Sequence, residues 1–368
     1  MNRKVVPFND LSRIHENLES DFISETKQIV SNSAFVLGQK VVNFESQYAS
    51  LEQANFCVGV DNGTNSIELM LRAVGVSAND EVITSAMTFI ATIFAIERIG
   101  AIPVLVDTLP NSPLMDYSQI QRKISKRTKA ILMVTLHGRI EYLNEFQEIA
   151  SKNNLILLID GAQSHLGRFQ NLPLVNFADA VSTSFYPGKN LGSLGEGGAV
   201  LTNSQEIAEK IKLYRDWGAK EKYMHDSWGG NFRLHSIQAA FLTIKLRHLT
   251  DWTAERKQIG NRYLSEITNS VVRPPVQEIG DHVYHIFDIR VSNRLKAISV
   301  LEEHEIAWGI HYPKAVSSNK AFQHLGKVTY QNATEFANTT LSIPLFPGML
   351  EEEIARVISA VNSIAKSE

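Results

Sequence analysis

Short apolar runs alternate along the first two thirds of the chain with stretches in which apolar positions recur every three or four residues. Residues 56–60 predict a buried strand, and residues 67–74 predict a helix that Gly75 ends. Further strands are predicted at residues 81–84, 104–106, 130–134, 155–159 and 180–184, and a second helix with Phe89 on its apolar face ends at Gly100. Strands that alternate with helices favour a mostly parallel sheet covered on both faces.

The pattern changes after about residue 233. Residues 234–249 predict a long helix that continues to about residue 262, residues 285–291 predict a strand, and residues 354–364 predict a final helix. We therefore expect an α/β fold with a large and a small domain. The predicted parts are an N-terminal arm (1–11), a large, mostly parallel α/β domain (12–240) and a smaller α+β domain (241–368).

Composition narrows the class of protein. Of the 368 residues, 44% are hydrophobic and 20% are charged, and the formal net charge of −3 argues against a nucleic-acid-binding surface. Cys57 is the single cysteine, which excludes an intrachain disulfide and a multi-cysteine metal site. The first residues lack the apolar core of a secretion signal, and no apolar run approaches the about 20 residues of a membrane helix. We expect a cytoplasmic protein without metal, nucleic acid or membrane.

Two residues at predicted strand ends suggest covalent chemistry. Asp160 closes the run of residues 155–159, and Lys189 lies in a Pro/Gly turn after residues 180–184. Ligands of such sheets bind beyond the carboxyl ends of the strands, where both residues fall. A lysine amine forms a Schiff base with the aldehyde of pyridoxal 5′-phosphate (PLP), and a carboxylate keeps the pyridine nitrogen protonated, so that the ring withdraws electrons. Alone the pair is a weak signal, because most turn lysines are solvated surface charges.

Three residues would suit the phosphate of such a cofactor. Gly63 and Thr64 open a predicted helix, where free backbone N–H groups and a hydroxyl make a phosphate cradle. Taken in isolation, the same pair is more simply explained as an N-cap. Ser184 ends a strand just before the lysine turn and would add a hydroxyl, although buried strand serines are more often structural.

Three further residues would suit the cofactor ring. Phe89 would stack on a flat ring, but taken alone its place on an apolar helix face is better explained by core packing. Gln163 would bond the phenolic oxygen, and His165 would support Asp160 from behind, unless both merely start a helix. The glycines of residues 192–198 precede a strand rather than linking a strand to a helix. They therefore form no dinucleotide fingerprint, which weakens the alternative of a nicotinamide-dependent sugar oxidoreductase.

Eight ordered segments together resemble the nucleotide-sugar aminotransferase family of the DegT/StrS type, within the aspartate aminotransferase (type I) fold class of PLP enzymes. The segments are VPFNDL (6–11), DNGT (61–64), DEVIT (80–84), TFIAT (88–92), DGAQ (160–163), SFYPGKNLG (184–192), GNFRL (230–234) and QAA (238–240). The resemblance runs from about Val6 to the C-terminus, and it implies that PLP is the cofactor.

The resemblance implies a role for each matching residue. Lys189 would hold PLP and, once released, carry a proton between the substrate α-carbon and the cofactor, so its amine should have a lowered pKa. Asp160 would pair with the pyridinium nitrogen. Asn231 matches an asparagine that the neighbouring subunit contributes to the phosphate site, which implies a homodimer with shared active sites. The other implied cofactor contacts are Gly63, Thr64 and Ser184 at the phosphate, Phe89 against the ring and Gln163 at the phenolic oxygen.

The implied reaction is a transamination in two halves. L-Glutamate gives its amino group to PLP, and the pyridoxamine form then aminates a keto carbon of a nucleotide-linked 6-deoxyhexose for aminosugar biosynthesis. A branch of the family that dehydrates sugars has histidine at the position of Lys189, so the lysine favours amino transfer. Residues 7–11 and 185–189 look like the branch acting on dTDP-3-oxo-6-deoxyhexoses. The branch that aminates C4 tends to show a His-Pro-Val-Lys turn, so we favour C3 and keep C4 as the alternative.

Family positions also suggest substrate contacts, although each of these residues is equally compatible with packing or exposure. They are Tyr186, Lys222, Tyr223, His311 and Tyr312.

The chain departs from the family pattern at three places. Residues 135–138 are Thr-Leu-His-Gly instead of a His-Leu-Tyr-Gly-like segment, His235 replaces a usual acidic residue, and Gly161 replaces a usual alanine. These changes leave the PLP chemistry intact but leave the sugar open. A non-catalytic PLP-fold regulator is a further alternative, which the joint presence of lysine, aspartate and phosphate groups argues against.

Overall fold

The structure is a computed structural model, and it describes residues 5–275, 279–325 and 328–365. A seven-stranded sheet dominates it, in the order β1-β10-β9-β6-β4-β2-β3. Neighbouring strands are parallel except around β10, which is antiparallel to both β1 and β9. The strands are β1 (Phe56–Val60), β2 (Glu81–Ser85), β3 (Ile102–Val106), β4 (Thr128–Val134), β6 (Ile156–Asp160), β9 (Ala180–Ser184) and β10 (Gly198–Thr202). The predicted strands are therefore confirmed.

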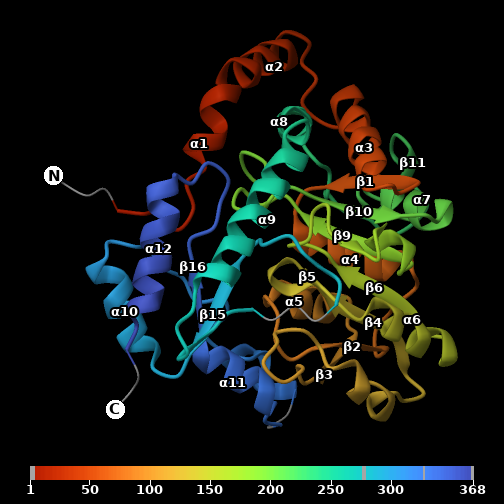
Figure 1. Cartoon of the computed structure of the whole chain (residues 1–368). Coiled ribbons are helices and arrows are strands. Elements are labelled where there is room, and N and C mark those ends of the chain that lie inside the picture. Colours follow the sequence, from red (N-terminus) through yellow and green to blue (C-terminus); the bar gives the residue numbers. More distant parts are fainter. Residues whose placement is uncertain (1–4, 276–278, 326–327, 366–368) are drawn as a thin grey trace.

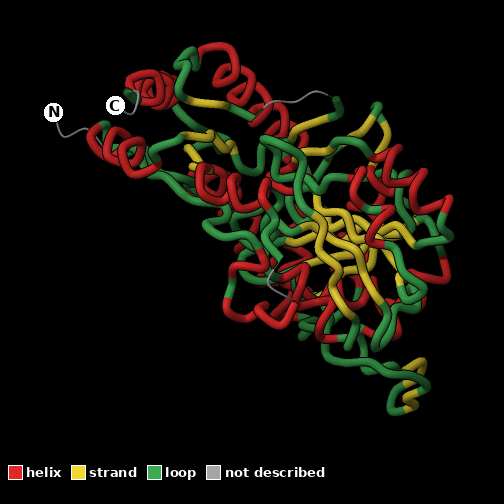
Figure 2. Tube along the Cα trace, turned by 90° about the horizontal axis from the view of Figure 1, so that it is seen from below, coloured by secondary structure: helices red, strands yellow, loops and turns green. Residues whose placement is uncertain are grey.

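Helices cover both faces of this sheet, and Figure 2 shows the strands gathered between them. Because successive side chains of a strand point to opposite faces, Ile131 and Met133 of β4 pack into one core and Ala130 and Leu132 into the other. Both faces are buried, which explains the continuous apolar runs in the sequence. One core is completed by α3 (Gln39–Leu51), α6 (Leu143–Lys152) and α8 (Ser236–Leu246), and the other by α4 (Gly63–Ala73), α5 (Ala91–Arg98) and α7 (Gln205–Tyr214).

A separate hydrophobic core lies beside the large sheet (Figure 1), around a three-stranded antiparallel sheet. Val6, near the N-terminus, is fully buried in this core and pairs with Ile306. Arg13 donates to Glu353 at 2.6 Å and ties the same N-terminal segment to the last helix. The elements of this core, named the small-domain core here, are β13 (Val272–Arg273), β15 (Phe287–Val291), β16 (Thr340–Ile343), α9 (Leu249–Glu266), α10 (Arg294–Glu303) and α12 (Glu351–Ser363). Helix α11 (Gln331–Thr339) packs into a further apolar cluster with Ala86, Met87 and Ile93. The predicted domain division at residue 240 stays a prediction.

Smaller elements connect these parts. The helices are α1 (Ser12–His15) and α2 (Glu19–Ser31), and the short strand pairs are β5 (Arg139–Ile140) with β14 (Asp281–His282), β7 (Arg168–Phe169) with β8 (Leu172–Pro173), and β11 (Ala219–Glu221) with β12 (Met224–His225). Short 3₁₀-helices span Glu16–Leu18, Tyr117–Gln119, Gln121–Lys123, Leu136–Gly138, Leu174–Asn176, Val316–Ser318 and Lys320–Leu325. Within the described ranges, no helix combines the length and apolar character needed to cross a bilayer.

Three details differ from the sequence predictions. The long helix predicted from residue 234 is broken between α8 and α9, where the His248 amide donates to the Lys245 carbonyl three residues back. The strand predicted from residue 285 starts only at Phe287, because the amides of residues 285 and 286 both donate to the His137 carbonyl. Phe89 precedes α5 instead of lying on its apolar face, and it is 52% exposed.

Candidate active site

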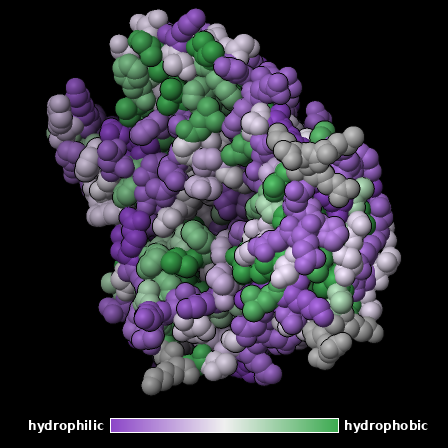
Figure 3. Space-filling view, turned by 90° about the vertical axis from the view of Figure 1, so that its left-hand side faces the viewer, coloured by the Kyte–Doolittle hydropathy of each residue, from purple (hydrophilic) through white to green (hydrophobic). Residues whose placement is uncertain are grey.

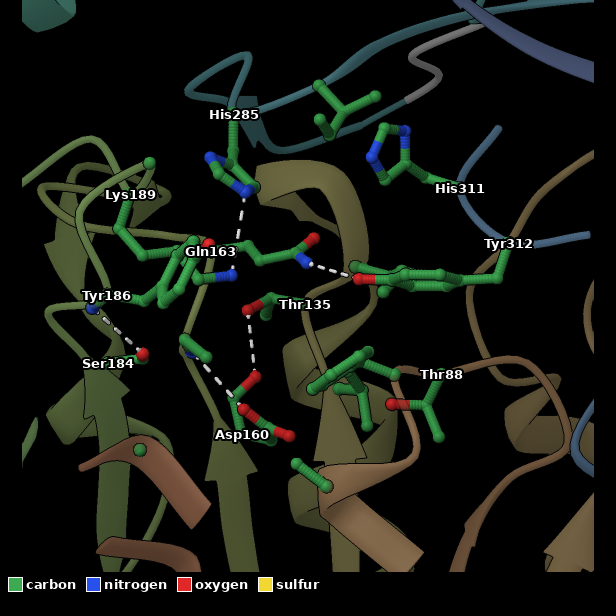
Figure 4. A pocket seen from close by; sticks show the side chains of 18 of the residues that line it. Thr88, Thr135, Asp160, Gln163, Ser184, Tyr186, Lys189, His285, His311 and Tyr312 are labelled. Atoms are coloured by element: carbon green, nitrogen blue, oxygen red, sulfur yellow. Dashed lines mark hydrogen bonds between the residues drawn. The ribbon is translucent and has the colours of Figure 1, made fainter. Parts of the chain in front are cut away.

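A cavity of about 900 Å³ opens at the carboxyl ends of the central strands, between the large sheet and the small-domain core. Its wall includes ten of the residues singled out from the sequence, so the fold brings distant segments to one place (Figure 4). They are Gly63, Thr64, Phe89, Asp160, Gln163, Ser184, Tyr186, Lys189, His311 and Tyr312.

Lys189 lies in the turn that follows β9, and its backbone N–H donates to the Tyr186 carbonyl at 2.8 Å. Loss of hydration in the cavity lowers the pKa of its amine to about 8, although the carboxylate of Asp160 acts in the opposite direction. The Lys189 Nζ lies 3.5 Å from His285 Nε2 (Figure 4). At neutral pH about a tenth of this amine is therefore uncharged and able to act as nucleophile or base, far more than for an ordinary lysine.

His285 is held by a second contact and was not foreseen. Its Nδ1 lies 3.2 Å from the Asn190 side-chain oxygen, which only accepts hydrogen bonds, so Nδ1 carries the hydrogen. Burial and the charge of Lys189 keep the pKa of His285 well below its ordinary value. The ring is thus neutral, and Nε2 presents a lone pair toward the lysine.

Asp160 ends β6 and is buried below the lysine. One carboxylate oxygen accepts from the Thr92 hydroxyl at 2.7 Å, and the other accepts from the Ala162 N–H at 3.2 Å. Burial raises the pKa of Asp160, while the hydrogen bond from Thr92 opposes that rise. The suggestion that His165 supports Asp160 was wrong, because His165 Nε2 contacts the Thr183 hydroxyl at 3.1 Å and Thr92 takes the supporting place.

The start of α4 and the end of β9 form a concave anion site. Asn62 caps α4, because its side-chain oxygen accepts from the Asn65 N–H at 2.9 Å. The Thr64 hydroxyl is therefore not used as the helix cap. A Cβ placed on Gly63 would come within 2.6 Å of the Ser184 Cβ, so only glycine lets the helix start approach the strand this closely. Backbone N–H groups at a helix N-terminus beside two hydroxyls are a suitable phosphate cradle.

Gln163 is locked in one orientation by both halves of its amide. Its oxygen accepts from the His137 N–H at 2.6 Å, which leaves the NH₂ group to donate to the Tyr312 hydroxyl at 3.2 Å (Figure 4). The Tyr312 ring lies against Phe89, with centroids 5.5 Å apart. The amide hydrogens of Gln163 therefore face the cavity, where its contact with the cofactor's phenolic oxygen stays a prediction.

His137, one of the departures from the family pattern, joins the two sides of the cavity. The side chain is fully buried, with Nδ1 2.9 Å from an Asp288 carboxylate oxygen and Nε2 2.9 Å from the His311 carbonyl. Both partners accept hydrogen bonds, so both ring nitrogens donate. Burial opposes ionisation of Asp288, but His137, together with Arg139 and His282, outweighs burial and holds the pKa of that carboxyl below its ordinary value. The pair links the segment after β4 to β15 and to the loop that bears Tyr312.

Replacing His137 by leucine is expected to destabilise the protein by about 3 kcal/mol, because the Asp288 carboxylate would stay buried without its partner. Urea unfolding of the purified variants would measure this change. The double variant His137→Leu/Asp288→Leu serves as the control and should recover part of the loss, since neither charge then remains. A double variant no more stable than His137→Leu would contradict the buried ion pair.

Three of the predicted residues do not line this cavity. Lys222 and Tyr223 lie at the turn between β11 and β12, where Tyr223 is 79% exposed. Asn231 is also exposed, and its side-chain oxygen accepts from Arg233. Other wall residues escaped the sequence analysis, namely Asn62, Thr88, Glu196, Arg256 and His285. The DNGT and TFIAT segments contain Asn62 and Thr88, so these two had a signal in the sequence and the other three had none.

The residues present fit PLP. The cavity offers an amine that is partly neutral near pH 8, a buried carboxylate near it and an anion cradle where α4 starts beside the end of β9. An aldehyde, a basic ring nitrogen and a phosphate are the three groups of PLP that require such partners.

Comparison with known proteins decides the family. Residues 16–362 match the DegT/DnrJ/EryC1/StrS aminotransferase family. The chain belongs to this family. It is therefore a PLP-dependent aminotransferase, which confirms the predicted fold class and cofactor and replaces the oxidoreductase alternative.

Individual relatives cover nearly the whole chain. The dTDP-3-amino-3,6-dideoxy-alpha-D-galactopyranose transaminase of Aneurinibacillus thermoaerophilus is 37% identical over 97% of this chain and 99% of its own length. The crystal structure of S. venezuelae DesV in complex with a ketimine intermediate superposes with a TM-score of 0.95, at 33% identity and 98% coverage of both chains. A "pleiotropic regulatory protein" of Geobacillus stearothermophilus is 35% identical, with 97% of both chains covered.

The lowered pKa of Lys189 predicts how cofactor-free protein takes up PLP. Only the neutral amine attacks the aldehyde, so the reconstitution rate should rise about tenfold per pH unit below pH 8 and level off above it. Rapid mixing with PLP between pH 6 and 9.5, followed at the visible absorption band, measures this profile. A rate that still rises tenfold per unit above pH 9 would contradict a pKa of about 8 for this amine.

Proposed function

We propose that this enzyme transfers an amino group from L-glutamate to the keto carbon of a nucleotide-linked 3-oxo-6-deoxyhexose, with dTDP as the nucleotide. The observation that carries the catalytic part is the shared cavity of Lys189 and Asp160 with the cradle of Gly63, Thr64 and Ser184. Bound PLP supplies the electron sink that makes the substrate α-hydrogen acidic.

Each side chain has a task that follows from its surroundings. Lys189 binds the cofactor aldehyde and, once free, moves the proton at the substrate α-carbon, for which its amine of pKa about 8 is suited. Asp160 holds a proton on the ring nitrogen, since it is buried and fixed by Thr92. Gln163 would donate to the phenolic oxygen from the NH₂ group that here contacts Tyr312, and Phe89, whose ring lies against Tyr312, would stack on the cofactor ring.

The proposal of C3 over C4 rests on two kinds of support. The turn of residues 185–189 resembles that of the 3-oxo branch, and the Aneurinibacillus thermoaerophilus relative is named for a 3-amino sugar. Tyr186, His311 and Tyr312 lie at the cavity wall, where a sugar ring would reach Lys189. A 4-oxo-6-deoxyhexose is the alternative substrate. A cytoplasmic location remains part of this proposal.

We infer that the active enzyme is a homodimer in which Asn231, Lys222 and Tyr223 serve the partner's cavity. All three are exposed and lie outside this chain's own cavity wall. Apolar side chains are also exposed on α2, on α3 and between them, and Figure 3 shows apolar surface gathered over the upper part of the molecule, where α2 lies. The residues are Ile23, Val30, Phe35, Val36 and Val42. Such exposed apolar surface is typical of a subunit interface.

The test begins with the absorption spectrum of the PLP-loaded enzyme before and after L-glutamate. Conversion of the visible band to that of the pyridoxamine form, absent with Lys189→Ala, would support the first half of the reaction. The pyridoxamine form would then be offered dTDP-3-oxo- and dTDP-4-oxo-6-deoxyhexoses, with mass-spectrometric detection of the aminosugar. Amination of the 4-oxo sugar alone would move the proposal to C4. An absorption band that no amino donor changes would favour the alternative of a non-catalytic regulator. The name of one relative, the "pleiotropic regulatory protein", also suggests regulation.

A further inference from the structure

Arg256 of α9 lines the cavity on the side of the small-domain core and is only 4% exposed. Its Nη1 donates to the backbone carbonyls of Tyr284 at 3.1 Å and Leu345 at 3.0 Å. These two bonds join α9 to the segments that enter β15 and leave β16. They occupy one edge of the guanidinium group.

The other edge of the same group is free. Nε is buried without a hydrogen-bond partner, and no partner of Nη2 is found within the described residues. Nε–H and an N–H of Nη2 point in parallel from this edge, which is the geometry that binds both oxygens of a carboxylate. The bonds of Nη1 to the two carbonyls explain how Arg256 holds the fold together, but they do not explain why Nε–H and Nη2–H have no partner.

Arg256 is exceptional among the buried arginines of the described chain. Arg139, Arg215 and Arg290 each pair with a carboxylate, from Glu141, Glu45 and Glu335 respectively. Arg256 has no such ion pair within the described residues. Burial lowers the pKa of its guanidinium to about 10, so the group still carries a positive charge at neutral pH. A buried cation without an anion is costly, and an anionic ligand in the cavity would offset that cost.

The position of Arg256 relative to Lys189 limits the chemical class of ligand that would bind there. His285 contacts the lysine amine at 3.5 Å, and the neighbouring Tyr284 carbonyl binds Arg256. Both positive charges therefore lie near His285, and after burial both contribute to depressing the pKa of that ring. Apolar groups of Ile286, Phe287 and Leu345 complete this part of the wall. A ligand with an amine and a carboxylate a few atoms apart matches this arrangement.

We propose that the Nε/Nη2 edge of Arg256 binds a carboxylate of the amino-acid donor and directs its amine toward Lys189. The inference rests on the proposed transamination and adds the residue that selects the donor. A single guanidinium edge fits one carboxylate, either the α- or the γ-carboxylate of L-glutamate.

The test compares Arg256→Lys with wild type in each half of the reaction separately. Lysine keeps the charge and can donate to the same two carbonyls, but it lacks the pair of parallel N–H donors that Nε and Nη2 of arginine provide. The rate of pyridoxamine formation per concentration of L-glutamate should fall about 10- to 100-fold, while amination of the keto sugar by the pyridoxamine form stays within threefold. Arg215→Lys is the matched control, because it alters a buried arginine whose carboxylate partner is Glu45, and it should spare both halves.

Binding of glutarate, a dicarboxylate without an amine, gives a readout independent of turnover. Glutarate should raise the melting temperature of cofactor-free wild type and should do so less for Arg256→Lys. The α-amide and the γ-amide of L-glutamate, each tested as amino donor with the wild type, identify the carboxylate that Arg256 binds. The amide that replaces the bound carboxylate should react poorly, and the other amide should react like L-glutamate. If Arg256→Lys fails to fold, Arg256→Gln takes its place in the same measurements, because glutamine can also donate to the backbone carbonyls but carries no charge for the carboxylate.

Three results would overturn the inference. They are equal losses in both half-reactions, which would indicate a diphosphate site or a structural role, no loss in the first half-reaction, and no effect of glutarate on the wild type. The wild type could convert no amino donor and still bind glutarate in a manner that depends on Arg256. This result would contradict the proposed transamination but would support the carboxylate site.

Discussion

Lys189→Ala should lower the rate of amino transfer by at least about 10⁴-fold, the largest effect expected of any single substitution in this chain. Two functions disappear with the amine. The cofactor loses its covalent attachment, and the proton at the substrate α-carbon loses the amine of pKa about 8 that would carry it. His285 is the nearest titratable neighbour, but burial keeps its pKa too low for this task.

The measurement is a single-turnover reaction with L-glutamate, followed at the PLP absorption band. Lys245→Met is the matched control. Lys245 is likewise buried, with burial lowering the pKa of its amine to about 8, but its partner is His15, outside the cavity. The control should keep its turnover within threefold. Partial restoration of Lys189→Ala by added small primary amines would further support a proton-transfer role, whereas a Lys189→Ala enzyme with more than a tenth of wild-type activity would overturn it.

Asp160→Asn is expected to reduce turnover by about 10²- to 10³-fold. Asparagine keeps the size of the side chain and can still accept from Thr92, but it carries no charge to hold a proton on the ring nitrogen. The defect should lie in kcat of both half-reactions, since each passes through the same ring. Binding of PLP should weaken much less, because the phosphate cradle is unchanged.

Asp179→Asn provides the control for Asp160. Asp179 accepts from the Leu157 N–H at 3.0 Å, at the opposite end of the same pair of strands. Its replacement should lower the melting temperature without a selective loss of kcat. If Asp160→Asn retained wild-type turnover at neutral pH, the proposed pairing of Asp160 with the ring nitrogen would have to be abandoned.

The strands of the large sheet were predictable because their signal is local. Each is buried on both faces, so its sequence is an apolar run, and turn residues mark where it ends. Asp160 and Lys189 could be found for the same reason, since strand ends of a parallel sheet lie at one edge.

The remaining features depend on contacts that no sequence pattern records. The break after α8 and the late start of β15 follow from hydrogen bonds with Lys245 and His137. Arg256 lies within a polar helix stretch, and its lack of an acidic partner becomes visible only when the fold is known. The reversed β10 follows β9 without an intervening helix, and an antiparallel neighbour needs no crossover.

The buried position of Val6 in the small-domain core affects the order of folding during synthesis. A chain leaves the ribosome N-terminus first, so the strands of the large sheet can assemble once β10 and α8 have emerged. Val6 and Arg13 cannot form their final contacts at that stage. The partner of Val6 is Ile306, and the partner of Arg13 is Glu353 of α12, near the other end of the chain. Val6 and Arg13 are thus made before the large sheet, yet they are among the last residues to reach their final contacts. A stalled or truncated product would expose them to chaperones and proteases.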